Sequence, residues 1–174
     1  SQSYTNSGYK ELSIAATEDG DFAMDPNSLH IWPRGSFMMI ALPNPDKTFT
    51  CTIFMPYEGE TGFDNINTDE EILSFMSTYF NDAMKLMPTL LEDFKSNPVG
   101  SLVTVRCYPW NINKATLIGD ACHAIVPFYG QGMNCAFEDC VVLDECLEEF
   151  GDWETAMQAY QVRRKPNADA IADL

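Results

Sequence analysis

The sequence of 174 residues is poor in basic side chains and has no long uncharged apolar run. Lysine and arginine together number 10 against 26 aspartates and glutamates, so the formal net charge is −16. A field of that sign repels phosphate backbones and anionic lipids, so binding of nucleic acid or of a membrane surface is not expected. No apolar run has the about 18 residues of a membrane-spanning helix, so no membrane segment is expected. The N-terminal residues also lack the features of a signal peptide.

The six cysteines lack the spacing of a zinc site or of a disulfide framework. A set made of Cys122, His123, Cys135 and Cys140 can be imagined as zinc ligands, but structural zinc sites use tighter pairs. We therefore expect no metal. We interpret most of the cysteines as small core residues in a reducing, cytoplasmic compartment.

The first part of the chain, residues 1–108, is predicted to be an antiparallel sheet with covering helices. Proline- and glycine-containing turns separate segments of strand character, and residues 48–55 show the period-two alternation of a strand with one buried face. Thr68 and Glu71 form a capping-box pattern that predicts the start of a helix. A second helical stretch from Met84 to Phe94 is interrupted at Pro88. The segments with strand character are 12–16, 29–32, 37–42, 48–55 and 102–107.

Residues 109–174 have a different character. Residues 115–118 form a short apolar run without alternation, which is typical of a strand buried on both faces. A loop rich in glycine and proline follows, and then a helix and a last helix from roughly Trp153 to Arg164, which Pro166 is expected to break or kink. The helix that directly follows the loop has a predicted apolar stripe, which consists of Met133, Phe137, Cys140, Val141, Asp144 and Leu147. Arg163 and Arg164 are interpreted as charges at a helix C-terminus. The two parts together predict an α+β fold with a strand–loop–helix segment of an α/β domain at the end.

The strand–loop–helix segment can hold a ligand with hydroxyl and phosphate groups. An aspartate at a strand end, here Asp120, accepts hydrogen bonds from sugar hydroxyls. Gly130 and Gly132 allow the backbone to approach a ligand closely. The helix that begins near Met133 presents free N–H groups and a partial positive charge. Each feature alone is also found in a plain loop followed by a core helix, which stays the alternative.

The string Gly119-Asp120-Ala121-Cys122-His123-Ala124, followed by Pro127 and by residues 130–134, resembles the GD motif of the FAD-dependent aromatic hydroxylases, the group of para-hydroxybenzoate hydroxylase. The resemblance implies that Asp120 binds the ribityl chain of FAD and that the following helix start lies by the pyrimidine side of the flavin. The flavin-binding residues that it implies are Gly119, Asp120, Pro127, Gly132, Met133 and Asn134. The pairs at 122–123 and 135–136 depart from the motif, where smaller residues are expected.

Further blocks over nearly the whole chain are similar to the members of this family that hydroxylate the aromatic ring of L-kynurenine in tryptophan catabolism. These blocks are 29–34, 37–43, 49–52, 125–134 and 137–140. The resemblance implies a substrate pocket lined by Leu29, Met38, Ile40, Leu42, Phe54, Pro127, Phe128 and Gln131. Period-two spacing places Met38, Ile40 and Leu42 on one face of a strand, although an ordinary core face has the same pattern. For Gln131 the alternative is a loop residue that satisfies backbone groups.

The reaction implied by the resemblance uses FAD, NADPH and O₂ to add one oxygen atom to the ring of L-kynurenine. The oxidising chemistry belongs to the cofactor, and the protein orients the ring and excludes water. We assign no catalytic residue. His30 and His123 are interpreted as residues that pack and form hydrogen bonds rather than as proton-transfer groups.

No GxGxxG pattern occurs in these residues, so the ADP half of FAD has no predicted site. The sequence is therefore expected to be an internal segment of a longer monooxygenase that alone neither holds FAD tightly nor turns over. Exposed apolar surface is expected to cause self-association of such a segment. A hydroxylase of the same family with another aromatic substrate stays an alternative, as does a non-catalytic interaction module with a flavin fold.

Overall fold

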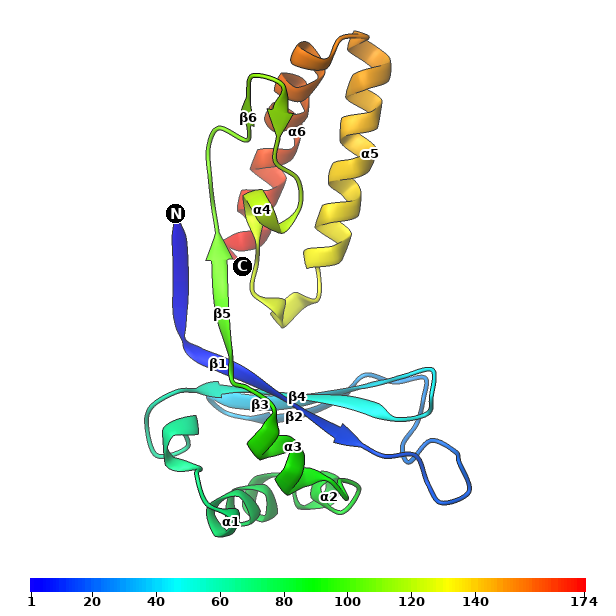
Figure 1. Ribbon diagram of the computed structural model, residues 1–174, viewed down its shortest axis with the longest axis vertical. Helices are drawn as coiled ribbons and strands as arrows, with labels where there is room; N and C mark the ends of the chain where they lie inside the picture. Colours follow the sequence, from blue (N-terminus) through cyan, green and yellow to red (C-terminus); the bar gives the residue numbers. More distant parts are fainter. The chain divides into compact units, whose positions relative to one another are not determined.

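The computed structural model describes all residues 1–174, which divide into two compact units. The sheet unit consists of residues 6–101, and the helical unit consists of residues 1–5 and 102–174 (Figure 1). Strands β1 (Gln2–Ile14) and β5 (Gly100–Val105) pass from one unit into the other. The predicted division into a substrate-binding part, 1–108, and an FAD-binding part, 109–174, assigns functions and stays a prediction.

The sheet unit is built on an antiparallel meander to which β1 returns. Its strands are ordered β2-β3-β4-β1-β5, with β2 (His30–Arg34), β3 (Phe37–Pro43) and β4 (Phe49–Pro56). The register pairs Met39 with Ile53 and Leu12 with Cys51. The predicted α+β class with an antiparallel sheet is confirmed, and β1 begins ten residues earlier than the predicted segment 12–16.

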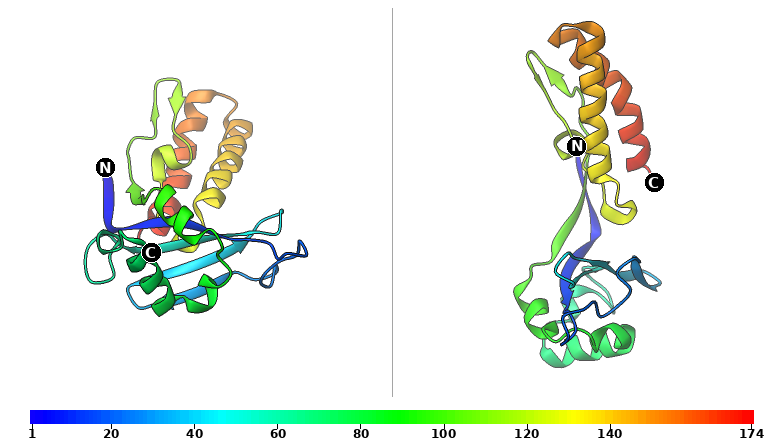
Figure 2. Two further views of the ribbon diagram at one scale, coloured as in Figure 1. Left: turned by 60° about the horizontal axis from the view of Figure 1, so that its bottom comes forward. Right: turned by 90° about the vertical axis from the view of Figure 1, so that its right-hand side faces the viewer.

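Three helices cover one face of this sheet, as Figures 1 and 2 show. They are α1 (Asp69–Tyr79), α2 (Asn81–Met84) and α3 (Leu90–Ser96), and a 3₁₀ helix (Phe63–Asn65) precedes them. The capping box at α1 is present, with Glu71 N–H donating to Thr68 Oγ1 and Thr68 N–H donating to Glu71 Oε2. Pro88 lies between α2 and α3, as predicted for the interrupted stretch.

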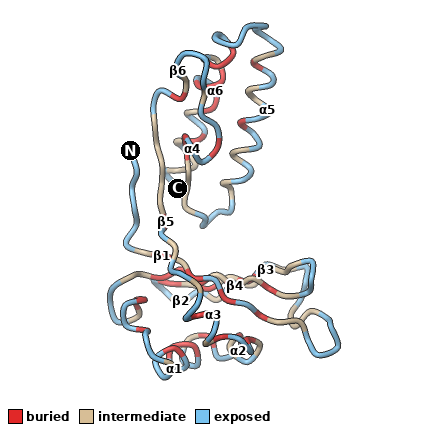
Figure 3. The backbone as a smooth tube through the Cα atoms, viewed as in Figure 1, coloured by how far each residue is buried: buried red, intermediate tan, exposed pale blue.

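The core of the sheet unit lies between the strands and these helices (Figure 3). Along β3, Phe37, Met39 and Ala41 are buried, whereas Met38, Ile40 and Leu42 point to the opposite face. The alternation follows from the period of two in a strand, because every second side chain faces the helices. The opposite face therefore carries apolar side chains that do not belong to this core.

The helical unit packs its two long helices, α5 (Gly132–Phe150) and α6 (Trp153–Ala172), side by side (Figure 2). A hairpin of β6 (Asn111–Ile112) and β7 (Ala115–Thr116), the short helix α4 (Asp120–His123) and a 3₁₀ turn (Pro127–Tyr129) precede α5. Its buried apolar cluster contains Trp110, Cys122, Cys146, Ala156, Tyr160 and Ala168. No helix of the chain combines the length and the apolar character that crossing a membrane requires.

The prediction of a strand buried on both faces at 115–118 is wrong. Only Ala115 and Thr116 are in a strand, and Leu117 and Ile118 are 39% and 38% exposed. β7 pairs with β6 alone, so no second strand flanks the run.

The predicted apolar stripe of α5 is not the buried face of the helix, so this prediction is also wrong. Met133, Phe137 and Val141 are 67%, 63% and 56% exposed. The helix has a second apolar stripe that packs against α6, and it is this stripe that is buried. It consists of Val142, Leu143, Cys146 and Leu147, with the buried Asp139 one turn before them, and Leu147 is the one residue that it shares with the predicted stripe.

The last helix continues past Pro166 to Ala172, so the expected end near Arg164 is wrong and Pro166 does not break the helix. Proline removes one hydrogen bond, the one to the carbonyl of residue 162, and Val162 is 68% exposed. The buried side chain of Ala168 lies beyond the proline and packs in the core, which favours continuation of the helix.

Candidate functional site

The Gly119–Asp120 turn is the point at which the chain enters α4. Gly119 has φ 61° and ψ −143°, a conformation that only glycine adopts without strain. A Cβ atom on Gly119 would also lie 3.3 Å from Cβ of Ala136 on α5. The turn therefore needs glycine for its dihedral angles and for its close approach to the helix.

The carboxylate of Asp139 holds this turn from inside the helical unit. Asp139 is fully buried on α5, and its Oδ2 accepts the N–H of Gly119 at 2.9 Å. The same oxygen lies 2.5 Å from Nε2 of His123, and Oδ1 accepts from Nε of Arg164 at 2.8 Å. Burial alone raises the pKa of Asp139, but the hydrogen bonds from His123, Arg164 and Gly119 outweigh it and lower the pKa below its ordinary value.

Arg164 lies on α6 and is 1% exposed, so its interpretation as a charge at a helix C-terminus is wrong. Besides Asp139, its guanidinium donates from Nη2 to the carbonyl oxygen of Cys135 at 3.2 Å. Nη1 lies 2.6 Å from Oε2 of the exposed Glu138, but this ion pair lacks the geometry of a hydrogen bond. We name the set Asp139, Arg164 and His123 the buried cluster.

His123 packs and forms hydrogen bonds, as the sequence interpretation proposed. It is 3% exposed, and its ring lies 5.3 Å from the ring of Trp110. The side-chain ligand atoms of Cys122, His123 and Asp139 lie within 4.8 Å of one another. Because both oxygens of Asp139 already accept hydrogen bonds, one of them from a cationic guanidinium, the set is poorly suited to a metal ion.

The glycine loop that follows leads into the uncapped N-terminus of α5. Gly130 adopts the left-handed conformation with φ 62° and ends the 3₁₀ turn. Cys135 makes the first backbone hydrogen bond of α5, to the carbonyl of Gln131, so the preceding N–H groups are free of helix partners. No side chain caps this end, and no acidic residue lies in its first turn. The helix N-terminus therefore offers free N–H donors and a partial positive charge to a ligand group that carries negative charge.

These elements line an open pocket of about 530 Å³ in the helical unit. Asp120 and the first residues of α5 both line the pocket. A Cβ atom on Gly130 or Gly132 would meet nothing within 4 Å, so both glycines leave the pocket open. The lining residues are Asp120, Ile125, Pro127, Gly130, Gly132, Met133 and Ala136.

Most of the predicted flavin-binding residues meet at this pocket. Asp120, Pro127, Gly132 and Met133 line it, and Gly119 directly precedes Asp120. The side chain of Asn134 does not line it but donates to Oε1 of Gln131 at 3.1 Å.

The predicted substrate-binding residues are divided between the two units. Met38, Ile40 and Leu42 share the face of β3 away from the helices, and Phe54 pairs with Met38 across the sheet. Leu29 precedes β2 and is 52% exposed.

The rest of this predicted set belongs to the helical unit. Phe128 is 47% exposed in the 3₁₀ turn. Pro127 lines the pocket, and Nε2 of Gln131 donates to the carbonyl of Tyr129 at 3.0 Å. The bond of Gln131 is the loop-stabilising contact that the alternative interpretation proposed.

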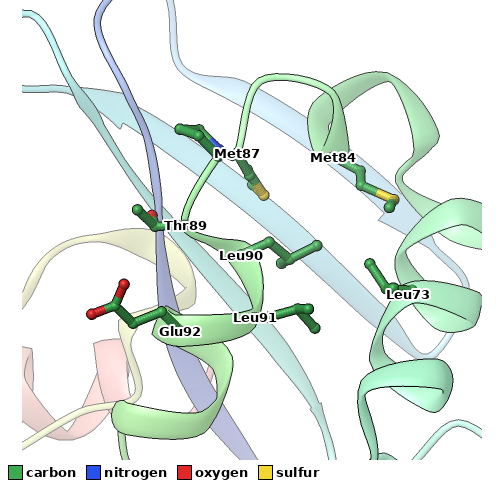
Figure 4. A pocket seen from close by; sticks show the side chains of 8 residues that line it. Leu73, Met84, Met87, Thr89, Leu90, Leu91 and Glu92 are labelled. Carbon is green, nitrogen blue, oxygen red and sulfur yellow. The ribbon is translucent and has the colours of Figure 1, made fainter.

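A second hollow, of about 360 Å³, lies among the helices of the sheet unit (Figure 4). Leu73 of α1, Met84 of α2 and Leu91 of α3 face it. It lacks a group of converging polar atoms, so it offers apolar contact but no evident chemistry.

The sequence interpretation missed Asp139 and Arg164. A signal was present, because Asp139 stands at helical spacing with Val142, Leu143 and Cys146, where a charge in an apolar stripe needs a buried partner. The predicted stripe on the other side of α5 concealed it.

A glycine-led turn, a carboxylate at its end and a free helix N-terminus surround one pocket, an arrangement suited to a ligand with hydroxyl and hydrogen-bond acceptor groups. The model of the FAD binding domain matches residues 20–174, and the chain belongs to this family.

The chain is similar over all or nearly all of its length to several kynurenine 3-monooxygenases. The kynurenine 3-monooxygenase of Christiangramia forsetii is 54% identical over 176 residues, which cover 100% of this chain and 39% of that protein. The kynurenine 3-monooxygenases of Dictyostelium discoideum and Myxococcus xanthus are 50% and 52% identical and cover 100% and 96% of this chain. They are covered over 41% and 36% of their own length, so the chain spans about two fifths of the relatives that it matches.

Solved structures share the fold. The tetrameric form of 2-methyl-3-hydroxypyridine-5-carboxylic acid oxygenase matches with a TM-score of 0.76 at 21% identity, over 99% of this chain and 46% of that chain. PqsL of P. aeruginosa in complex with 2-aminobenzoylacetate matches with a TM-score of 0.75 at 16% identity, over 99% of this chain and 47% of that chain.

Proposed function

We propose that the full-length protein is an FAD- and NADPH-dependent monooxygenase that hydroxylates the aromatic ring of L-kynurenine to 3-hydroxykynurenine. The observation that carries the proposal is the identity of 54% along the whole chain to a relative named kynurenine 3-monooxygenase. The pocket of the helical unit supplies independent support, because its chemistry suits part of a flavin cofactor.

The residues around this pocket fit FAD. The carboxylate of Asp120 is an acceptor for the hydroxyl groups of a ribityl chain. The free N–H groups at the start of α5 are donors for carbonyl oxygens and stabilise negative charge. A Cβ atom on Gly130 or Gly132 would have no neighbour within 4 Å, so both glycines leave open space for a flat ring system. We therefore assign flavin binding to Gly119, Asp120, Pro127, Gly132, Met133 and Asn134.

FAD supplies the oxygen-transfer chemistry when it is bound, with electrons from NADPH and oxygen from O₂. The chain's own part is to bind the cofactor, orient the ring and exclude water. No side chain of the chain is proposed as a proton donor or acceptor. The 2-amino group of kynurenine already activates its ring, so a strong base is less necessary than for a phenol.

The apolar face of the sheet unit is proposed as a wall of the substrate pocket. Met38, Ile40 and Leu42 project from β3 at a spacing of two, with Phe54 beside them on β4. This face offers an aromatic ring apolar contacts that are not used in the core of the sheet unit. The proposed substrate-binding set also includes Leu29, Pro127, Phe128 and Gln131.

We further propose that residues 1–108 serve the substrate, that residues 109–174 serve FAD, and that the protein works in the cytoplasm. The isolated 174-residue chain is proposed to self-associate, because Met133, Phe137 and Val141 form an exposed apolar stripe on α5.

The test is turnover by the purified full-length protein. L-kynurenine, NADPH and O₂ are supplied, and NADPH oxidation and 3-hydroxykynurenine are measured by absorbance and mass spectrometry. For most of the NADPH molecules that are oxidised, we expect one molecule of 3-hydroxykynurenine to form. NADPH oxidation with a hydroxylated product only from another aromatic substrate, such as 2-aminobenzoylacetate, favours a hydroxylase of the same family that acts on that substrate. A protein that binds no flavin contradicts both and favours an interaction module.

A further inference from the structure

We propose that the buried cluster positions the two walls of the flavin pocket, so that Asp139 and Arg164 are positioning residues for FAD binding. The cluster connects the Gly119–Asp120 turn with the first turn of α5. The inference rests on the proposed function, because it gives the cluster a role in a flavin site.

The first connection runs through the backbone of Gly119. Its carbonyl accepts the N–H groups of Cys122 and His123 at 3.0 and 3.1 Å, bonds that belong to the local turn. Its N–H has no local partner and donates to Asp139, which lies 20 residues away on α5. Asp139 therefore orients the peptide group between Ile118 and Gly119. This orientation also affects the position of the next residue, Asp120.

The second connection runs through the guanidinium of Arg164. It binds Asp139 by Nε and the carbonyl of Cys135 by Nη2, so one planar group fixes two points of α5 from α6. Cys135 lies three residues after Gly132, at the end of the first turn. The contacts therefore hold the helix start, where Gly132 and Met133 line the pocket, against the rest of the helical unit.

The cluster is a costly way to stabilise a core. Asp139 is 0% and Arg164 is 1% exposed, and replacing such a buried pair by apolar side chains is often neutral or stabilising. Apolar side chains, however, cannot accept the N–H of Gly119 or donate to the carbonyl of Cys135. Directional bonds to two pocket walls explain the charges better than stability does.

The experiment compares two double variants of the full-length protein, Asp139→Leu/Arg164→Met and Asp139→Asn/Arg164→Met. Neither has the ion pair, and they differ in whether residue 139 offers an acceptor to Gly119. The dissociation constant of FAD is measured by quenching of flavin fluorescence. We expect FAD to bind the leucine variant about tenfold or more weakly than the asparagine variant, which corresponds to the loss of one buried hydrogen bond. Equal affinities at similar melting temperatures overturn the proposal.

A second readout does not require FAD. Amide hydrogen exchange of the peptide containing residues 117–124, in the apoprotein, is expected to be faster in the leucine variant than in the asparagine variant. Equal exchange overturns the proposal, whereas a wild-type protein that binds no FAD overturns the proposed function. The exchange result still decides whether the cluster holds the turn.

Two single variants complete the design. Arg163→Met is the matched control, because Arg163 is exposed and contacts Glu149 and the ring of Phe150, neither of which lines the pocket, and it should leave FAD affinity unchanged. If the leucine variant does not fold, Arg164→Lys decides, because it keeps the charge but lacks the fork that reaches both Asp139 and Cys135. Weaker FAD binding at an unchanged melting temperature is expected, and unchanged binding overturns the proposal.

Discussion

The backbone N–H of Gly119 donates to Oδ2 of Asp139 at 2.9 Å, across 20 residues of sequence. This single bond joins the most recognisable part of the sequence, the Gly-Asp turn, to a buried carboxylate that the turn itself does not indicate. The geometry of the candidate site therefore depends on a long-range contact as well as on its local glycines.

The pH dependence of stability should reveal the buried carboxylate. The pKa of Asp139 is lower in the folded chain than in the unfolded chain, so the unfolded chain binds the proton first as the pH falls. The stabilisation is complete above the ordinary aspartate pKa of about 3.9 and is lost as the pH falls through the lower folded value. Urea unfolding of the wild type and of Asp139→Asn between pH 7 and pH 2 should show the difference in this acid range. Parallel curves for the two proteins would contradict the assignment.

Substitution of Asp120 should affect the ligand rather than the fold. Asp120 is exposed at the pocket and Asp120→Asn keeps its size, so the melting temperature of the full-length protein without FAD should change little. Loss of charge-assisted hydrogen bonds to the ribityl chain should weaken FAD binding about tenfold to a hundredfold. Asp144→Asn is the control, because Asp144 is exposed on α5 and does not line the pocket. Equal FAD affinity of the two variants would remove Asp120 from the site.

Adjacent residues of β3 should separate substrate binding from stability. Met39 is fully buried in the core, so Met39→Ala should lower the free energy of unfolding by about 2–5 kcal/mol. Ile40→Ala lies on the other face and should raise the KM for L-kynurenine while the FAD content stays unchanged. Thermal melting and steady-state kinetics check the pair. An unchanged KM for Ile40→Ala would argue that this face does not touch the substrate.

The cysteines should differ in their reaction with iodoacetamide. Burial raises the pKa of the Cys51 and Cys122 thiols to about 12, so only about one molecule in 10,000 is a thiolate at pH 8. Cys140 is exposed on α5 and should be alkylated first. Peptide mapping by mass spectrometry of the native protein gives the order. Early labelling of Cys51 or Cys122 would contradict the packing of the two cores.

Local patterns predicted the sheet unit well. The capping box at Thr68 and the alternation in β3 and β4 depend on neighbours in sequence, and the structure contains them. The α+β class followed from these elements. The same local signals indicated the pocket residues Asp120 and Gly132, because a glycine turn and a helix start are short-range features.

The errors arose where partners lie far apart in sequence. The run at 115–118 has the composition of a buried strand, but burial needs flanking strands that this chain does not pair with it. The choice between the two stripes of α5 was decided by α6, and the buried role of Arg164 depends on Asp139. The end of α6 was expected near Arg164 because the packing of Ala168 beyond Pro166 was not visible in the sequence.

A crystal structure of the full-length protein with FAD tests the central claim most directly. The account predicts that the carboxylate of Asp120 accepts a hydrogen bond from a ribityl hydroxyl and that the start of α5 faces the pyrimidine edge of the flavin. It also predicts that the bond between Gly119 and Asp139 is retained. Flavin bound away from Asp120, with the pocket of the helical unit filled by solvent, would contradict the account.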